Sequence, residues 1–324
     1  MARTDTLGNF LTDVADAIRE KKGTTDTILA SNFDTEIASI ESGVDINEYL
    51  SDTITKGTSS SGGWVKTIIK LRSPLTVEGT SAEYMFYRYS LNELPQLDTS
   101  NVNRMDYMFS GCKNITTIPQ LDTSNVFRMS YMFGSCTNLT TIPQLNTSNV
   151  ANMDYMFYNC SNLTTIPQLD TSNVFRMSYM FGSCTNLTTI PQIDTSNVTI
   201  MDYTFYNCSN LTTMPQLNGE KLTDIVSAFN GCKSLENFNG IINLGQEYST
   251  TQSANSNYYK LILSDSTKLT EQSIINILNN LYDIATKGCN TQTVTLGATN
   301  LAKLTSTEGQ QALASAQSKG WNIN

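Results

Sequence analysis

The sequence predicts an α/β solenoid, because a 24-residue unit occurs in five consecutive copies between residues 97 and 216. The first copy reads LDTSNVNRMDYMFSGCKNITTIPQ, and the second and fourth copies are identical to each other. The third and fifth copies are near twins, so a 48-residue duplication overlies the 24-residue unit. A unit of this size cannot bury its own apolar face and gains a core only by stacking on its neighbours.

Each unit is expected to contain one short helix and one short strand. In the third copy, the apolar residues from Val150 to Cys160 are spaced three, four and three apart, which predicts a helix that Thr147 or Ser148 can cap. The run LTTIPQL that follows predicts a short strand, which its proline limits. Strands stack about 4.8 Å apart and helices about 8 to 10 Å apart, so we expect a curved array with the helices outside.

Three segments precede the repeats. Residues 1–43 predict a helical hairpin, which either folds back as a cap or serves as an attachment and oligomerisation module. Residues 44–63 form a Gly/Ser linker, and residues 64–96 an N-terminal cap with a degenerate first repeat. The docking seam that we expect on the first helix comprises Leu7, Leu11, Val14 and Ile18.

The repeats extend over residues 97–240, and residues 241–324 predict a C-terminal cap built of larger strand-helix units. Thr270 is expected to cap the first helix of this segment. Thr305 and Glu308 have the spacing of a capping box for the second helix. The expected elements are strands at 260–263, 292–296 and 321–323 and helices at 271–285 and 307–319.

The order Leu, Ile-Pro, Val, Met, Met-Phe, Cys, Leu resembles the BspA-like leucine-rich repeats of bacterial surface proteins, over about residues 75–240. The Thr-Ser-Asn-Val and Tyr-Met-Phe forms resemble the subgroup in Firmicutes surface and prophage proteins. The resemblance implies a leucine-rich-repeat array and leaves the ligand open, since this repeat serves many partners. The run AIREKKGTTDTI resembles the N-terminal modules of many Firmicutes phage tail and fibre proteins.

Composition argues against several classes of function. The net charge of −9 argues against a nucleic-acid partner or an anionic membrane. The chain has no histidine, which removes the commonest general base and metal ligand, and we expect no cofactor or metal. Six of the seven cysteines recur once per unit from Cys112 to Cys232, and this period indicates a row of buried thiols instead of disulfides or a metal site.

The candidate ligand surface lies where the copies differ, at positions expected to point away from the core. Aromatic rings beside Asn and Arg can stack on sugar rings or anchor a protein. The alternative is drift on a tolerant surface, or aromatic rings tucked between units. The candidate residues are Phe127, Arg128, Tyr158, Asn159, Phe175, Arg176, Tyr206 and Asn207.

The opposite side carries a uniform ladder, with Thr116, Thr117 and Gln120 in the first unit and their equivalents beyond. Such a ladder indicates stacking and solubility, although a flat polymer ligand is an alternative. The recurring aspartates, beginning with Asp98, are explained by turn chemistry better than by calcium. No pair of carboxylates stands apart from the repeat, as glycoside hydrolysis would require.

These observations predict a non-enzymatic phage tail-associated protein, a fibre or receptor-binding component located in the virion and exposed after release. Residues 1–43 would dock to tail or baseplate proteins, and the repeats would face host cell-surface carbohydrate or protein. Self-association is expected, with a trimer favoured. The start, MARTDTLGNF, shows no secretion signal, and no segment is apolar enough to enter a membrane. The alternative is a leucine-rich-repeat adhesin at the bacterial cell surface.

Overall fold

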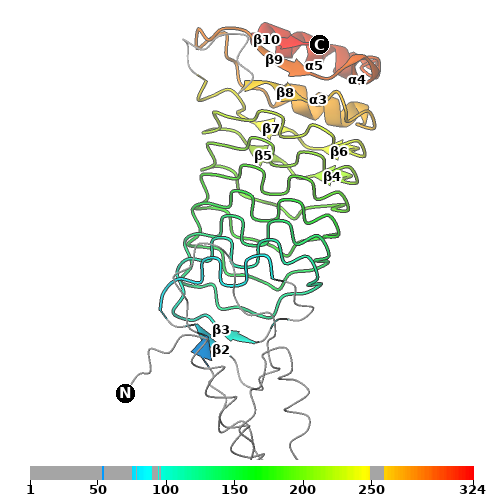
Figure 1. Cartoon of the computed structure of the whole chain (residues 1–324). Helices are drawn as coiled ribbons and strands as arrows, with labels where there is room; N and C mark the ends of the chain where they lie inside the picture. Colours follow the sequence, from blue (N-terminus) through cyan, green and yellow to red (C-terminus); the bar gives the residue numbers. More distant parts are fainter. Residues whose placement is uncertain (1–52, 55–74, 78, 90–93, 95, 249–258) are drawn as a thin grey trace, which may run out of the picture.

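The computed structural model describes residues 53–54, 75–77, 79–89, 94, 96–248 and 259–324. The predicted helical module of residues 1–43, with its seam of Leu7, Leu11, Val14 and Ile18, lies outside the described residues, as does most of the linker. The described part is an elongated stack of coils that runs from β2 and β3 at one end to α5 and β10 at the other (Figure 1). Here a coil is one turn of the solenoid.

Neighbouring coils are joined by short parallel pairings. Single bridges join Arg104 to Arg128, and Arg128 to Asn152, and continue to Asp224 at the same interval. Between them, main-chain bonds cross from coil to coil, such as Phe109 N to Met132 O at 2.9 Å. Two-residue and three-residue strands extend these pairings at both ends: β1 (Thr53–Ile54), β2 (Leu75–Val77), β3 (Leu97–Asp98), β4 (Thr213–Met214), β5 (Leu217–Asn218), β6 (Asn237–Phe238) and β7 (Ile241–Ile242). The chain is therefore a repeat solenoid with short parallel strands.

The short outer helices predicted for the repeats are wrong, because residues 97–240 contain turns and no helix. In each coil up to Tyr203 one tyrosine adopts a positive φ, for example 58° at Tyr107 and 57° at Tyr131, and Ser227 does so in the last coil; such a residue stops a right-handed helix. The N–H groups of the turn bond to the next coil instead. The difference in spacing between strands and helices, on which the predicted curvature rested, is therefore absent from the repeats.

The core consists of rows of equivalent residues that run along the stack. The phenylalanine row from Phe86 to Phe229 is stacked ring on ring, with centroids 5.5–5.8 Å apart and planes within 16° of parallel. The predicted row of buried thiols is confirmed: Cys112 to Cys232 are free and fully buried, and each Sγ donates to a phenylalanine carbonyl 2.9–3.2 Å away. Burial raises the pKa of the Cys112 thiol to about 12.

The corner before each turn links coils through side chains. The Thr147 hydroxyl donates to Asp170 O in the next coil at 2.8 Å, so its predicted role as a helix cap is wrong. Asp122 Oδ1 accepts from the backbone N and the hydroxyl of Ser124 at 3.0 and 2.7 Å. These bonds lower the pKa of Asp122 and confirm that the recurring aspartates shape turns.

Residues 259–324 form larger units. Their strands β8 (Leu261–Ile262), β9 (Gln292–Thr295) and β10 (Trp321–Ile323) make a parallel sheet in the order β10-β9-β8, and their helices are α3 (Glu271–Asn279), α4 (Ala298–Leu301) and α5 (Thr307–Ser318). Thr270 caps α3 as predicted. The capping box is wrong, because Ser306 caps α5 and accepts from Gly309 N at 3.0 Å. Within the described ranges, no helix has both the length and the apolarity that a bilayer crossing demands.

Candidate recognition surface

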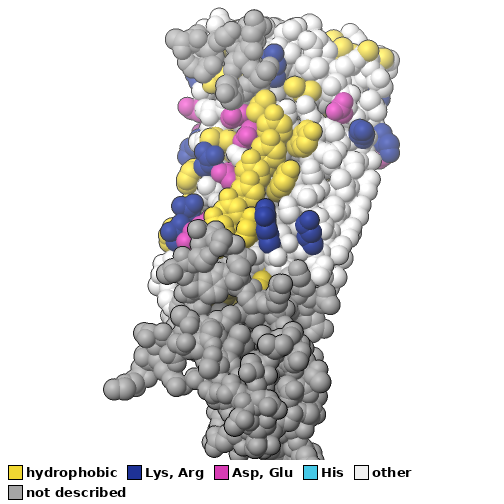
Figure 2. All heavy atoms as spheres, viewed as in Figure 1, with side chains coloured by type: hydrophobic (Ala, Val, Ile, Leu, Met, Phe, Trp, Pro, Cys, Tyr) yellow, Lys and Arg dark blue, Asp and Glu magenta, His cyan; other side chains and the backbone are white. Residues whose placement is uncertain are grey.

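A ladder of stacked tyrosines runs along one face of the solenoid. Neighbouring ring centroids are 4.2–4.7 Å apart and the planes lie within 9° of parallel. Figure 2 shows a continuous band of hydrophobic side chains along this face, with Lys, Arg, Asp and Glu beside it. The faces of the inner rings cover one another, so the ladder presents ring edges to solvent. The tyrosine ladder consists of Tyr84, Tyr107, Tyr131, Tyr155, Tyr179 and Tyr203.

Two of the predicted site residues, Tyr158 and Tyr206, pack against this ladder. The Tyr158 ring makes edge contacts with Tyr155 and Tyr179, at centroid distances of 5.6 and 5.9 Å and interplanar angles of 73° and 81°. Tyr206 contacts Tyr203 in the same way, at 5.5 Å and 69°, and its side chain remains 39% exposed. The structure therefore brings both residues onto one aromatic surface.

Phe127 and Phe175 form a second row, in the coils that alternate with those of Tyr158 and Tyr206. Ala151 separates them: its backbone N donates to Phe127 O, and its O accepts from Phe175 N at 3.0 Å, so the two phenylalanines are two coils apart. Their exposed fractions are 43% and 45%, which excludes the alternative that these rings are tucked between units. They are among the largest apolar groups that the described surface presents.

The predicted arginines make ion pairs with aspartates of the preceding coil. Arg176 Nε lies 2.8 Å from Asp154 Oδ2, and Arg128 Nε lies 3.2 Å from Asp106 Oδ2. Asp106 is buried, and its pKa is raised because desolvation outweighs the attraction of Arg128. Arg128 and Arg176 therefore neutralise carboxylates of this face, which sequence reasoning did not foresee.

The predicted asparagines are explained by backbone geometry. Asn159 and Asn207 have φ of 57° and 56°, a region that asparagine tolerates better than most residues. Asn159 N donates to Gly182 O at 2.7 Å, so the residue turns the chain while holding the next coil. Both asparagines lie directly after Tyr158 and Tyr206 in the sequence.

Sequence reasoning missed the tyrosine ladder itself, because it searched for positions that vary and this tyrosine does not vary. The available signal was a tyrosine two residues after the first Met of every unit, as in Tyr131 after Met129. At a coil spacing of about 4.8 Å, equivalent aromatic side chains must stack. The structure adds Tyr131 and its equivalents to the site as its floor.

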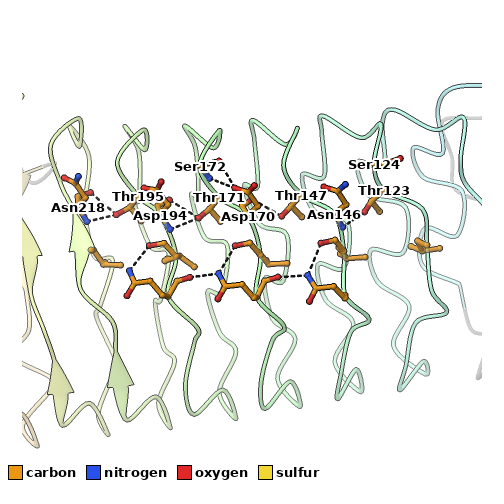
Figure 3. Close-up of a pocket in the computed structure, with 18 of the residues that line it drawn as sticks. Thr123, Ser124, Asn146, Thr147, Asp170, Thr171, Ser172, Asp194, Thr195 and Asn218 are labelled. Atoms are coloured by element: carbon orange, nitrogen blue, oxygen red, sulfur yellow. Dashed lines mark hydrogen bonds between the residues drawn. The ribbon is translucent and has the colours of Figure 1, made fainter.

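An open groove of about 1310 Å³ runs across the coils. The residues that line it lie about half a unit away in the sequence from the tyrosines of the ladder. Figure 3 shows its labelled wall, where Asn146, Asp170, Asp194 and Asn218 lie in one row. The opposite wall is a glutamine ladder: Gln168 Nε2 donates to Leu169 O at 3.0 Å and to an oxygen of the next coil at 2.6 Å. The expected role of this ladder in stacking is confirmed.

Within the described ranges, no three His, Cys, Asp or Glu side chains come together as metal ligands.

Two comparisons bear on identity. A search of curated proteins gives no match. The family model described as "Mycoplasma protein of unknown function, DUF285" matches residues 80–188 and 136–241, which together span half of the 324 residues. This repeat-type match agrees with the BspA-like repeat expected from the sequence and with the observed solenoid. The chain therefore belongs to the DUF285 family of repeat proteins.

Proposed function

We propose that this protein is a non-enzymatic recognition component of a phage tail, a fibre or receptor-binding protein whose repeats face a host cell surface. The observation that carries the proposal is the set of aromatic side chains on the outside of the stacked coils: Phe127, Phe175 and Tyr206 are exposed, and Tyr158 is half-buried against the tyrosine ladder. Large apolar groups gathered on a rigid surface are typical of binding sites, where aromatic residues supply much of the binding free energy. This surface is the proposed contact with host carbohydrate or protein.

The assignment to a phage tail is supported by the resemblance of the run AIREKKGTTDTI to N-terminal modules of tail and fibre proteins. In this proposal residues 1–43 dock to tail or baseplate proteins and also drive self-association into a trimer. The repeats then project from the particle, and the protein is exposed outside the cell after release. The second candidate is a bacterial surface adhesin, which the repeat alone motivates.

Location decides between the two candidates. Antibodies raised against residues 97–240 should label tails in negative-stain images of particles from an induced culture. Label confined to the walls of uninduced cells, with every particle bare, would refute the tail assignment and support the adhesin.

Oligomeric state is tested separately by light scattering of the full chain and of a Leu11→Asp, Ile18→Asp variant. A trimeric mass that falls to a monomer in the variant is expected. An unchanged mass would exclude the seam.

A fluorescent full chain should bind host cells, and cell-wall sugars should not be cleaved. Turnover that one carboxylate substitution abolishes would contradict the non-enzymatic proposal.

A further inference from the structure

Three tyrosines occupy equivalent positions beside the ladder, each three residues after a ladder tyrosine. These outer rings are Tyr87, Tyr158 and Tyr206. Their centroids lie 5.5–6.3 Å from the ladder rings and their planes are inclined by 69–82°, which is the geometry of edge-to-face contact. The two ladder rings that Tyr158 contacts, Tyr155 and Tyr179, are covered on both faces, so they contribute their edges and Tyr158 lies with one face on the ladder. Tyr206 makes the equivalent contact with Tyr203, the last ring of the ladder.

The free face of one outer ring already has an occupant. The planar guanidinium of Arg88 lies over the Tyr87 ring, 5.0 Å from its centroid. Asn159 and Asn207 replace Arg88 in the two other coils, and in the described ranges no cation or further ring lies over Tyr158 or Tyr206. Tyr206 is 39% exposed and Tyr158 is half-buried, so each ring keeps surface that a flat group from outside can reach.

The Tyr158 ring is fixed in place before any ligand arrives. Two ladder rings hold its inner face, and the adjacent coil carries Gly182, where an added Cβ would lie 3.3 Å from Tyr158 Cδ2. A ring held against the surface cannot insert into a pocket of a protein partner, but it offers a ready plane for stacking. Preorganisation of this kind lowers the entropy cost of binding.

Charge and spacing identify the class of ligand. Nucleobases also stack on tyrosine, but a nucleic acid needs cationic side chains for its phosphates, and here Arg176 is paired with Asp154 on a chain of net charge −9. A pyranose offers an apolar face of C–H groups and a rim of hydroxyls that suits Asn159 and Asn207. Tyr158 and Tyr206 are two coils apart, about 9.6 Å at the usual strand spacing. This separation is about the length of two sugars in an extended chain.

We propose that Tyr158 and Tyr206 form a two-ring platform for a linear, uncharged β-1,4-linked polysaccharide that lies along the solenoid axis. In such a chain alternate sugars turn the same face to one side, so every second sugar can stack on a ring. The inference rests on the proposed recognition function and names the ligand class of that surface.

The probes are the β-1,4-linked hexasaccharides of N-acetylglucosamine and of glucose, titrated into the full chain by calorimetry. Tyr158→Ala and Tyr206→Ala should each weaken binding about two- to tenfold, the range expected for loss of one ring contact. The double variant should abolish measurable binding. Tyr158→Phe and Tyr206→Phe keep the rings and should retain affinity. Tyr87→Ala is the matched control, and its affinity should equal that of the natural chain because Arg88 already covers that ring.

A second variant moves one ring without removing it. Gly182→Ala adds a Cβ 3.2 Å from Tyr179 Cδ1 and 3.3 Å from Tyr158 Cδ2, so it should tilt Tyr158 and weaken binding. Circular dichroism and thermal melting verify that each variant is folded. The platform is refuted if neither hexasaccharide binds at millimolar concentration, or if the double variant binds as well as the natural chain.

Failure of the platform is distinguishable from failure of the proposed function. If the natural chain binds host cells and the double variant binds them equally, recognition stands and the platform is wrong. If protease treatment of the cells abolishes binding, the ligand is a protein and the platform is again wrong. If the hexasaccharides bind but particles carry no label, the platform stands and the tail assignment fails.

Discussion

Placing a third carboxylate between two existing ones tests why neighbouring coils differ. Ser178 lies between Asp154 and Asp202 of the flanking coils: its backbone N donates to Asp154 Oδ1 at 2.8 Å, and its hydroxyl donates to Asp202 Oδ1. The same arrangement places Ser130 after Asp106 in the earlier pair of coils. Serine thus keeps the carboxylates of this row two coils apart. The Ser178→Asp variant removes that separation.

The cost follows from distance and dielectric. Two unit charges about 4.8 Å apart repel by about 3.5 kcal/mol at an effective dielectric constant of 20. Arg176 is paired with Asp154 and offsets part of the repulsion from that carboxylate. Asp202 Oδ1 accepts instead from the Ser178 hydroxyl, so the repulsion from Asp202 is not offset in this way. The introduced carboxyl can escape the repulsion by taking up a proton, so the penalty cannot exceed the free energy of protonating it at pH 7. That free energy is about 1.4 kcal/mol for each pH unit between about 3.9 and 7, or about 4 kcal/mol in total. We expect the free energy of unfolding to fall by about 2 to 4 kcal/mol at pH 7.

The assay is urea unfolding at several pH values, with Ser178→Asn as the uncharged control of matched shape. Repulsion raises the pKa of the introduced carboxyl in the folded state. The penalty is therefore complete above that raised pKa and disappears as the pH falls toward the unfolded value of about 3.9. At pH 4 the two variants should differ by less than about 1 kcal/mol. Equal stability of the two variants at pH 7 would refute the electrostatic explanation of the alternation.

Three further predictions concern other parts of the chain. In the native protein a thiol reagent should modify Cys289 first and leave the six repeat thiols protected until denaturant is added; rapid reaction of all seven would contradict their burial. Gln168→Glu replaces two donated bonds with repulsion from the same carbonyls and should lower stability in urea by about 1 kcal/mol, whereas an unchanged midpoint would mean that the ladder contributes nothing. Glu271 accepts from Ser306 N, which lowers its pKa, so Glu271→Gln should destabilise the chain above pH 4.5, with the difference lost as the pH falls through the lowered value; a difference that does not change with pH would exclude this cause.

The stacking of the repeats was predictable, but their local conformation was not. Apolar spacing of three, four and three is shared by a helical face and by successive turns whose side chains point inward. The deciding feature is the positive φ of residues such as Tyr107 and Tyr155, and tyrosine gives no sequence signal for that conformation. The hydrogen bonds to the adjacent coils hold it there, and these are tertiary contacts that a single unit does not contain.

The candidate site was predictable in membership more than in geometry. Phe127 and Phe175 are exposed as variable outward positions should be, while Arg128 and Arg176 turn out to be partners of buried or half-buried carboxylates. The orientation of Tyr158 depends on two rings from different coils. Such an arrangement follows from the coil spacing and from side-chain packing, so it becomes visible only when the coils are assembled.

One period explains both the charge row and the aromatic platform. If every coil were identical, aspartates of neighbouring coils would lie about 4.8 Å apart and repel one another. Every coil would also carry an outer tyrosine, and no glycine such as Gly182 would leave room for the Tyr158 ring. The two-coil repeat alternates Asp154 with Ser178, and Tyr158 with Gly182, in the same pair of coils. A variant with glycine at every outer-ring position should therefore keep its charge pairing and lose sugar binding, and its stability should fall only by the loss of the edge-to-face ring contacts. A variant with aspartate in every coil should lose stability through charge repulsion, while its folded form keeps the rings and binds sugar. If the folded aspartate variant also failed to bind, the two roles of the period would not be separable.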